Sequence, residues 1–390
     1  MPQGMAGEKQ FDDTSKEQIK DKRVSGNEAK LFVTLGKDGS LKPTNRRIPH
    51  SAFAKYGELG GAEFAPVLEW FALNLSEAAG MPTTDFALVK QDNDLPPYLI
   101  VERFDMSPTK EHSKNHSRIM QDFLSLSGLN GHEKQNGRLL DDNFSYEDLT
   151  LHLIDICKKH EVSAADTRNL VEDYMKRTVL SWAVCDGDFH AKNASVFLDH
   201  NRKTGKVKVS LTPNYDIHLN GVEGEQNISM FYRMTSKHSK GRSTSFQQIS
   251  DFITSDRIND ALESLGADPI ARTAEDASKL ALSIIKPCTD KALSMMQNLP
   301  PEIKDYKYKE SMMTDIQCGV HNLLQRAKKA GYDQTAAFEL EKQPGKMRKR
   351  SGYVARKQAK GKDFHETMKR MFEISRSRGS GQYSSPNRRT

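Results

Sequence analysis

The hydrophobic pattern of this chain changes at about residue 105, and this change limits the possible folds more than any other feature. Short strand-like runs at 29–36 and 50–57 precede a predicted helix that starts at Pro66 and stops at Gly80. Two further apolar runs, 85–91 and 97–105, flank turn residues and predict a hairpin. The first part of the chain is therefore expected to be rich in strands.

Helical patterns dominate the chain after residue 105. Residues 166–184 carry apolar pairs spaced four apart, which is typical of a buried helix. The runs 194–199 and 207–212 then predict a second hairpin. Amphipathic segments come next, near 246–264, 273–298 and 307–330. This order predicts an α+β fold.

Composition excludes several classes of protein. A chain of 390 residues with 36% hydrophobic content is long enough for two domains or one large bilobal one. Its four cysteines are dispersed, so neither a disulfide framework nor a zinc site is indicated. The N-terminus has no apolar core and no run of apolar residues could span a bilayer, which predicts a cytoplasmic protein without a membrane partner.

The positive charge of the chain is concentrated at its C-terminus. Residues 341–390 hold fifteen Lys and Arg against four Asp and Glu, a net charge of +11, which leaves −5 for residues 1–340 out of the total of +6. Such a tail is usually solubilising, and a weak contact with nucleic acid is the alternative. We expect residues 336–390 to form a partly disordered basic tail and residues 1–22 a flexible leader.

The stretch CDGDFHAKNASVFLD, residues 185–199, concentrates polar groups between the predicted helix and the second hairpin. Asp188 precedes Asn193 by five residues, which is the spacing between base and metal ligand in a protein-kinase catalytic loop. Asp216 comes after the hairpin, where a second magnesium ligand is expected, and Lys192 could neutralise charge on a transferred phosphoryl group. The pattern favours phosphoryl transfer.

Simpler interpretations exist for each of these residues. Asp and Asn are good turn formers after a helix, and Lys55, in the strand-like run 50–57, could be an ordinary strand lysine. We interpret His190 as structural and Asp186 as a solvated neighbour of Asp188.

Several motifs in a consistent order resemble the HipA family of serine/threonine kinases, toxins of bacterial toxin–antitoxin modules. The strongest are DFHAKN, LTPNYDI and LIVERFD. SGNEAK at 25–30 resembles the family's phosphate-covering loop, and PHSAFAK at 49–55 resembles the strand that ends in the ATP-binding lysine. The resemblance covers about residues 23–330 and implies a divergent bilobal protein-kinase-like fold, with an N-lobe over 23–105 and a helical C-lobe over 106–335.

The resemblance also implies roles for single residues. Asp188 would be the catalytic base, assisted by Lys192, and Asn193 and Asp216 would bind Mg²⁺. Glu69 matches a family position on the helix, and its pairing with the lysine is implied by the general kinase plan. The residues that would contact ATP are Lys55, Glu102, Arg103, Phe104, Ser25 and Gly26.

Three features depart from the family pattern. Glu28 stands where the loop has a glutamine. Full-length members carry a long additional segment before this loop, whereas 22 residues precede it here, so the chain resembles the short HipT-like toxins. Arg23 occupies the position of one autophosphorylated serine, which leaves Ser25 as the candidate.

The implied activity is transfer of the ATP γ-phosphate to a serine of a protein, with an aminoacyl-tRNA synthetase as the expected target. A small antitoxin and a HipB-like DNA-binding protein are the implied partners. A phosphotransferase acting on small molecules is one alternative, although such enzymes usually carry His-x-Asp where this chain has Asp188-Phe-His190. An inactive kinase-like binding module is the other.

Overall fold

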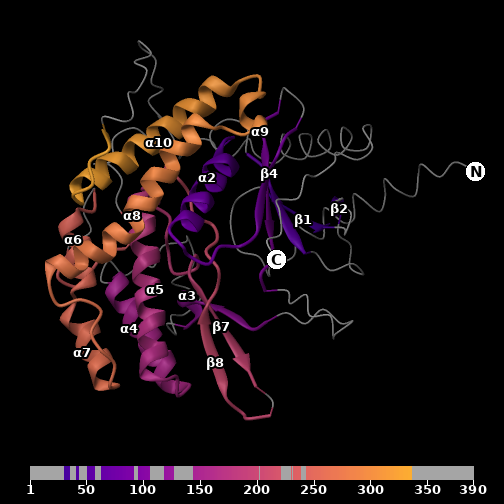
Figure 1. The fold of residues 1–390 in the computed structure, drawn as a ribbon. Helices are drawn as coiled ribbons and strands as arrows, with labels where there is room; N and C mark the ends of the chain where they lie inside the picture. Colours follow the sequence, from indigo (N-terminus) through magenta and orange to yellow (C-terminus); the bar gives the residue numbers. More distant parts are fainter. Residues whose placement is uncertain are drawn as a thin grey trace, which may run out of the picture. The chain divides into compact units, whose positions relative to one another are not determined.

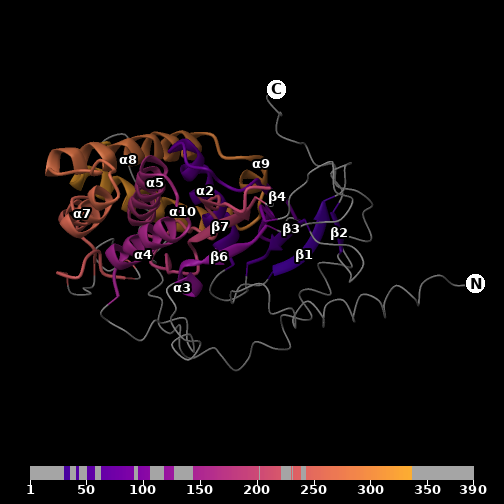
Figure 2. The ribbon, with the colours of Figure 1, turned by 90° about the horizontal axis from the view of Figure 1, so that it is seen from below.

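In the computed structural model the described residues form two compact units, the first from Lys30 to Glu63 and the second from Phe64 to Thr335. Figures 1 and 2 show their elements from two directions. The described residues are 30–35, 41–43, 51–57, 63–91, 95–105, 118–126, 144–201, 203–220, 230, 232–238 and 243–335.

The first unit contains three antiparallel strands. β1 (Lys30–Leu35) pairs with both β2 (Leu41–Pro43) and β3 (Ala52–Lys55). Phe32 and Phe53 face each other across β1 and β3, with ring centroids 5.4 Å apart. The two strands predicted at 29–36 and 50–57 are confirmed. The sequence did not indicate β2, because three residues are too few to show an alternating pattern.

The second unit begins with a helix and a hairpin. α2 (Ala65–Ala78) has a proline in its first turn, and Gly80 comes after it with a φ of 72°, a conformation that glycine adopts at little cost. β4 (Phe86–Val89) and β5 (Tyr98–Glu102) pair in antiparallel fashion. Both sequence predictions are confirmed.

A separate three-stranded sheet comes next in the same unit. β7 (Ser195–His200) is its central strand and pairs with β6 (Met120–Asp122) and β8 (Val207–Leu211), all antiparallel. The β7–β8 hairpin was predicted, but β6 was not, because it is short and largely exposed and so has no apolar alternation. The short helix α3 (Phe123–Leu126) begins directly after β6.

Long helices form most of this unit. α5 lies between α4 and α8, and α8 also contacts α2 and α10 (Figures 1 and 2). The helices are α4 (Tyr146–Lys159), α5 (Ala164–Ala183), α6 (Phe246–Ile253), α7 (Asp256–Ser264), α8 (Ala274–Gln297), α9 (Pro301–Lys304) and α10 (Lys309–Lys329). None of the helices in the described residues is both long enough and apolar enough to cross a membrane.

Serine caps determine where several helices begin. The hydroxyl of Ser163 accepts the N–H of Asp166 at the start of α5, and Ser145 forms a reciprocal capping box with Asp148 at the start of α4. Ser255 caps α7 in the same way as Ser163 caps α5. The segment predicted as one helix over 246–264 is therefore two, since a new cap interrupts it.

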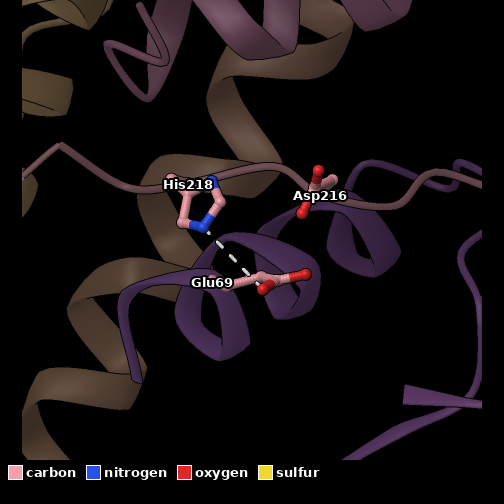
Figure 3. Close-up of side chains that lie close together, drawn as sticks. All are labelled: Glu69, Asp216 and His218. Atoms are coloured by element: carbon pink, nitrogen blue, oxygen red, sulfur yellow. Dashed lines mark ion pairs between the residues drawn. The ribbon is translucent and has the colours of Figure 1, made fainter. Parts of the chain in front are cut away.

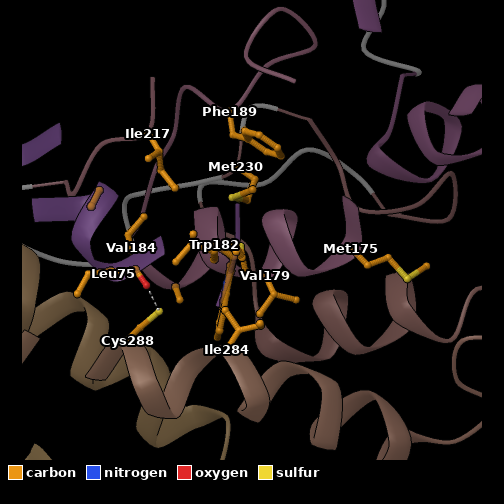
Figure 4. Close-up of a cluster of buried hydrophobic side chains, with 14 of the residues drawn as sticks. Leu75, Met175, Val179, Trp182, Val184, Phe189, Ile217, Met230, Ile284 and Cys288 are labelled. Atoms are coloured by element: carbon orange, nitrogen blue, oxygen red, sulfur yellow. Dashed lines mark hydrogen bonds between the residues drawn. The ribbon is translucent and has the colours of Figure 1, made fainter. Parts of the chain in front are cut away.

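The core of the second unit lies between α5 and α8. Trp182 of α5 is 1% exposed and meets Val179 and Ile284 in the cluster shown in Figure 4. Its indole N–H donates to Thr244 O at 2.8 Å. The guanidinium of Arg326 from α10 lies 5.1 Å from the Trp182 ring and donates to the Trp182 carbonyl. Because Arg326 is 2% exposed, these contacts offset part of the cost of burying its charge.

A Gly319→Ala substitution should destabilise the protein. A Cβ on Gly319 of α10 would lie 2.5 Å from Cγ of Leu219, a side chain that is fully buried. Overpacking of this kind costs about 1–3 kcal/mol, and the better helix propensity of alanine returns at most about 1 kcal/mol. Urea unfolding of the variant should show a lower midpoint with an unchanged slope.

Leu219→Ala supplies the matched control. It leaves a cavity and should be destabilising alone, but it also makes room for the new methyl group, so the double variant should lose less than the sum of the single losses. Additive losses would show that the two side chains do not compete for the same space.

Candidate functional site

The chain reverses sharply where α5 ends. Cys185 has a φ of 58°, which is uncommon for a residue other than glycine. The next residue, Asp186, donates its N–H to Ser181 O at 2.8 Å, and its Oδ1 accepts the N–H of Asp188 at 3.1 Å. This turn sends the chain out of the helix and presents the exposed side chain of Asp188.

The loop then closes on itself. The N–H of His190 donates to Asp188 O at 2.7 Å, and the N–H of Asn193 donates to His190 O at 2.8 Å. Asn193 also donates from Nδ2 to Asp188 O at 2.9 Å. This hydrogen bond fixes the orientation of the side-chain amide, so its Oδ1 points away from Asp188 O and can accept from, or bind, another group. These hydrogen bonds hold Asp188 and Asn193 together, the two residues whose spacing resembles that of a kinase catalytic loop.

Aromatic residues support the loop from the interior. Tyr146 stacks on Phe189 with centroids 5.8 Å apart and donates its O–H to Phe189 O at 2.5 Å. Tyr232 accepts the N–H of Ala191 at 3.3 Å. Burial raises the pKa of both tyrosines, so they remain neutral hydrogen-bonding groups.

Tyr215 connects the loop to the residue predicted to bind metal. Its O–H donates to Lys192 O at 2.9 Å, and the same oxygen lies 2.6 Å from the Ser195 hydroxyl. Its ring lies 5.3 Å from that of Phe104, just past β5. Since Asp216 is the next residue, these contacts bring Phe104, Lys192 and Asp216 to one side of the second unit.

The segment around Asp216 is held at both ends by main-chain hydrogen bonds. On one side Asn214 donates to Pro82 O at 2.7 Å. On the other, Leu219 donates to Leu68 O of α2 at 3.3 Å and Asn220 donates to Val184 O, just after α5, at 3.1 Å. Asp216 itself has a φ of 56° between these anchors. The segment is therefore positioned by two different helices.

Three potential ligand atoms meet beside α2. Glu69, Asp216 and His218 each contribute one, and all three lie within 4.8 Å of one another (Figure 3). His218 Nε2 is 3.8 Å from Glu69 Oε2. Glu69 is 1% exposed, although it does not lie on the helix face that Val67, Phe71 and Leu75 share. The helix is thus buried on more of its circumference than the sequence indicates.

The prediction that Asp186 is a solvated neighbour is wrong. The residue is 2% exposed, and its Oδ2 has no hydrogen-bond partner within the described part of the chain. Burial raises the pKa of its carboxyl to about 7; His218 opposes this rise, and the carboxylates of Asp188 and Asp216 add to it. The local sequence at the end of α5 does not indicate that Asp186 is buried, because the residues that cover it are distant in the sequence.

The other predicted site residues lie on β3, at β5 and beyond the described part of the chain. Lys55 is 6% exposed at the end of β3 and belongs to the first unit. Glu102 ends β5, with its N–H donating to Asp85 O and its carbonyl accepting from Thr84 Oγ1. Arg103 pairs with Asp105. Ser25 and Gly26 lie outside the described residues.

Sequence reasoning missed the contributions of Tyr215 and His218. Both flank Asp216 in the stretch NYDIHLN, so adjacency to a predicted ligand was the available signal. The residues that Tyr215 and His218 contact are distant in the sequence, so these contacts could not be predicted from the stretch itself.

This α+β combination of long helices and small antiparallel sheets is that of a kinase-like fold. Residues 23–288 match the HipA-like C-terminal domain, so the chain belongs to the HipA-like family. The expected family resemblance is confirmed.

Solved structures are similar at low sequence identity. The HipA of a Shewanella oneidensis MR-1 toxin–antitoxin complex with HipB and operator DNA has a TM-score of 0.58 at 14% identity, covering 84% of this chain and 73% of the other. The Helicobacter pylori proinflammatory kinase CtkA has a TM-score of 0.42 at 12% identity, covering 81% of this chain and 94% of the other. A search of curated proteins found no match.

Asp186 should make the stability of the protein depend on pH. Its folded pKa of about 7 lies above the reference value of 3.8, so the folded state binds the proton more tightly between these values and stability falls as pH rises through that window. Asp186→Asn keeps the Oδ1 acceptor but cannot ionise. From pH 5 to pH 8 the free energy of unfolding of the variant should therefore improve relative to wild type by roughly 2–3 kcal/mol.

The measurement is urea unfolding of both proteins at pH 5, 6.5 and 8 with a chelator present. Asp173→Asn, an exposed carboxylate of α5, is the control and should show the wild-type pH dependence. If the Asp186→Asn and wild-type curves run parallel, Asp186 does not carry the shifted titration.

Proposed function

We propose that this protein is an ATP- and magnesium-dependent serine/threonine protein kinase. The observation that carries the proposal is the pairing of the Asp188–Asn193 loop with Asp216 through the Tyr215 contact to Lys192. A base, an amide oxygen and a carboxylate then lie on one side of the unit. Phosphoryl transfer requires these groups, since positioning and charge stabilisation supply most of its catalysis.

The donor set fits Mg²⁺. Asn193 Oδ1 and the Asp216 carboxylate are hard oxygen ligands, and the Nδ2 bond of Asn193 to Asp188 O already selects which end of the amide is available. When bound, the ion would neutralise charge on the phosphates. We assign Asn193 and Asp216 as its ligands.

We assign the other steps of phosphoryl transfer to side chains of the loop. Asp188 is exposed and accepts the proton of the substrate hydroxyl as general base. Lys192 lies half-buried one residue before Asn193 and offsets negative charge on the phosphoryl group. The N–H of Asp188 is held by Asp186, which limits how far the base can move.

We assign ATP to the residues that the family resemblance selects. Phe104 packs against Tyr215 and Phe197, which places an apolar ring beside the loop for contact with adenine. The main-chain N–H of Glu102 already donates to Asp85 O and its carbonyl accepts from Thr84 Oγ1, so Glu102 would act through its side chain or the second lone pair of its carbonyl. Lys55 and the loop with Ser25 and Gly26 would contact the phosphates.

The biological role proposed is that of a toxin in a toxin–antitoxin module. Membership in the HipA-like family supports it, and the similar Shewanella oneidensis structure is a complex of HipA with HipB and operator DNA. By analogy, we propose a HipB-like DNA-binding partner, a small antitoxin and a cytoplasmic site of action. The proposed substrate is a serine of an aminoacyl-tRNA synthetase.

Substitution of the base and of the metal ligand should separate two defects. Asp188→Asn should lower phosphoryl transfer by on the order of 10²–10⁴ while Mg-ATP affinity is kept. Asp216→Asn should abolish transfer and also weaken Mg-ATP binding, because it removes a ligand of the cation. Radiolabel transfer from ATP into lysate proteins and calorimetric titration with Mg-ATP measure the two effects.

Asp268→Asn is the matched control, since this carboxylate is exposed on the turn between α7 and α8. It should behave as wild type in both assays. Full activity and equal nucleotide affinity in the Asp188 and Asp216 variants would refute the kinase proposal.

Ser25 is proposed as an autophosphorylation site. A phosphate there would add about −1.5 to −2 charges beside bound triphosphate and should reduce ATP binding. Ser25→Ala should stay active longer than wild type during incubation with Mg-ATP, and Ser25→Asp should be weak from the start. Ser15→Ala, in the preceding leader, is the control. Phosphopeptide mapping that labels other sites but leaves the 24–30 peptide unmodified would exclude this switch.

A further inference from the structure

His218 lies where three functional segments of the second unit meet. It comes two residues after Asp216, and its Nε2 is 3.8 Å from Glu69 Oε2 on α2 (Figure 3). The His218 side chain is 24% exposed and that of Glu69 is 1% exposed. The imidazole is partly exposed, but its Nε2, which faces the Glu69 carboxylate, is buried.

A second buried carboxylate is coupled to the same imidazole. Asp186 is 2% exposed, and a positive charge on His218 would favour its ionised form. Asp186 Oδ1 accepts the N–H of Asp188, the proposed base. His218 is therefore linked electrostatically to the start of the catalytic loop as well as to α2.

The main chain on the C-terminal side of His218 reaches the same two elements. Leu219 donates to Leu68 O, one residue before Glu69, and Asn220 donates to Val184 O, two residues before Asp186. The backbone and the imidazole therefore connect the Asp216 segment to the same two places. Because the main-chain hydrogen bonds and the imidazole contact join the same segments, His218 differs from a surface histidine that contacts one acidic residue by chance.

We propose that His218 is a positioning residue that holds the Asp216 segment in register with the Asp188 loop and α2 before nucleotide binds. This inference rests on the proposed kinase function, because it assigns Asp216 to the metal and Asp188 to the acceptor hydroxyl.

The physical basis is charge balance in a poorly hydrated region. Carboxylate oxygens of Glu69 and Asp216 lie within 4.8 Å of one another, and Asp216 also raises the pKa of Asp186, so these acidic groups repel one another when they are ionised and poorly hydrated. A protonated imidazole beside Glu69 would offset that repulsion and favour one arrangement of the three segments. Without it, the Asp216 segment should shift or fluctuate, and the enzyme would have to order it during binding.

Amide hydrogen exchange of the protein without nucleotide, in the presence of a chelator, tests the inference independently of activity. In His218→Gln, the amides of Leu219, Asn220 and Asp188 should exchange about tenfold faster than in wild type, because each donates within the coupled segments. Amides of α8 should keep their wild-type rates, which shows that the variant remains folded.

Two further variants make the test specific. His218→Lys keeps a cation beside the carboxylates and should recover most of the protection. His152→Gln removes a half-buried histidine that stacks on Phe144 of the same unit and should leave the three amides unchanged. Glu69→Gln combined with His218→Gln should accelerate exchange by less than the product of the single effects, since both disrupt one contact.

Kinetics give the second readout. His218→Gln should raise the magnesium concentration required for half-maximal rate about tenfold while the dependence on protein substrate stays unchanged, as expected when only the Asp216 segment is displaced. If wild-type protein transfers no phosphate, the kinase proposal fails. The hydrogen-exchange measurement still tests the positioning role of His218, because it does not depend on activity.

Two outcomes would overturn the inference. One is unchanged exchange at Leu219, Asn220 and Asp188 in His218→Gln. The other is a rise in wild-type melting temperature on adding Mn²⁺ or Zn²⁺ without nucleotide that disappears in His218→Gln, because it would make Glu69, Asp216 and His218 the ligands of a metal ion instead.

Discussion

The proposed site depends on the main-chain hydrogen bonds that hold the Asp216 segment. Leu219 reaches the carbonyl of Leu68 on α2, and Asn220 reaches the carbonyl of Val184 where α5 has just ended. Because α2 and α5 both pack on α8, the segment takes its position from the main core. The absence of a Cβ at Gly319 allows α10 to close over Leu219. A loop with little regular structure is thereby positioned by rigid helices, as a preorganised site requires.

Charge is the second constraint on this region. Asp186 and Glu69 are buried carboxylates, and the cost of removing such groups from water is large unless polar partners or opposite charges compensate. Asp186 accepts one main-chain N–H, and His218 lies beside Glu69. Active sites commonly retain such costly groups, because they fix geometry and tune neighbouring charges. The raised pKa of Asp186 comes mainly from its burial, and the carboxylates of Asp188 and Asp216 add to it.

Family membership and site geometry support different parts of the functional conclusion. The match over residues 23–288 establishes the HipA-like family, and similarity to a HipA structure at 14% identity establishes the fold. Neither assigns a substrate, because one fold carries many activities. The proposed chemistry rests instead on Asp188, Asn193 and Asp216 and on their connection through Tyr215.

The sequence alone determined the residue types and spacing of the Asp188–Asn193 loop, the place of Asp216 after a hairpin, and most helices and strands, since these depend on local periodicity and turn chemistry. It could not indicate β6, whose three residues show no alternation. The tertiary structure decided that Asp186 and Glu69 are buried and that His218 lies beside Glu69. Burial of a polar residue depends on which distant segments cover it, and only long-range packing establishes that.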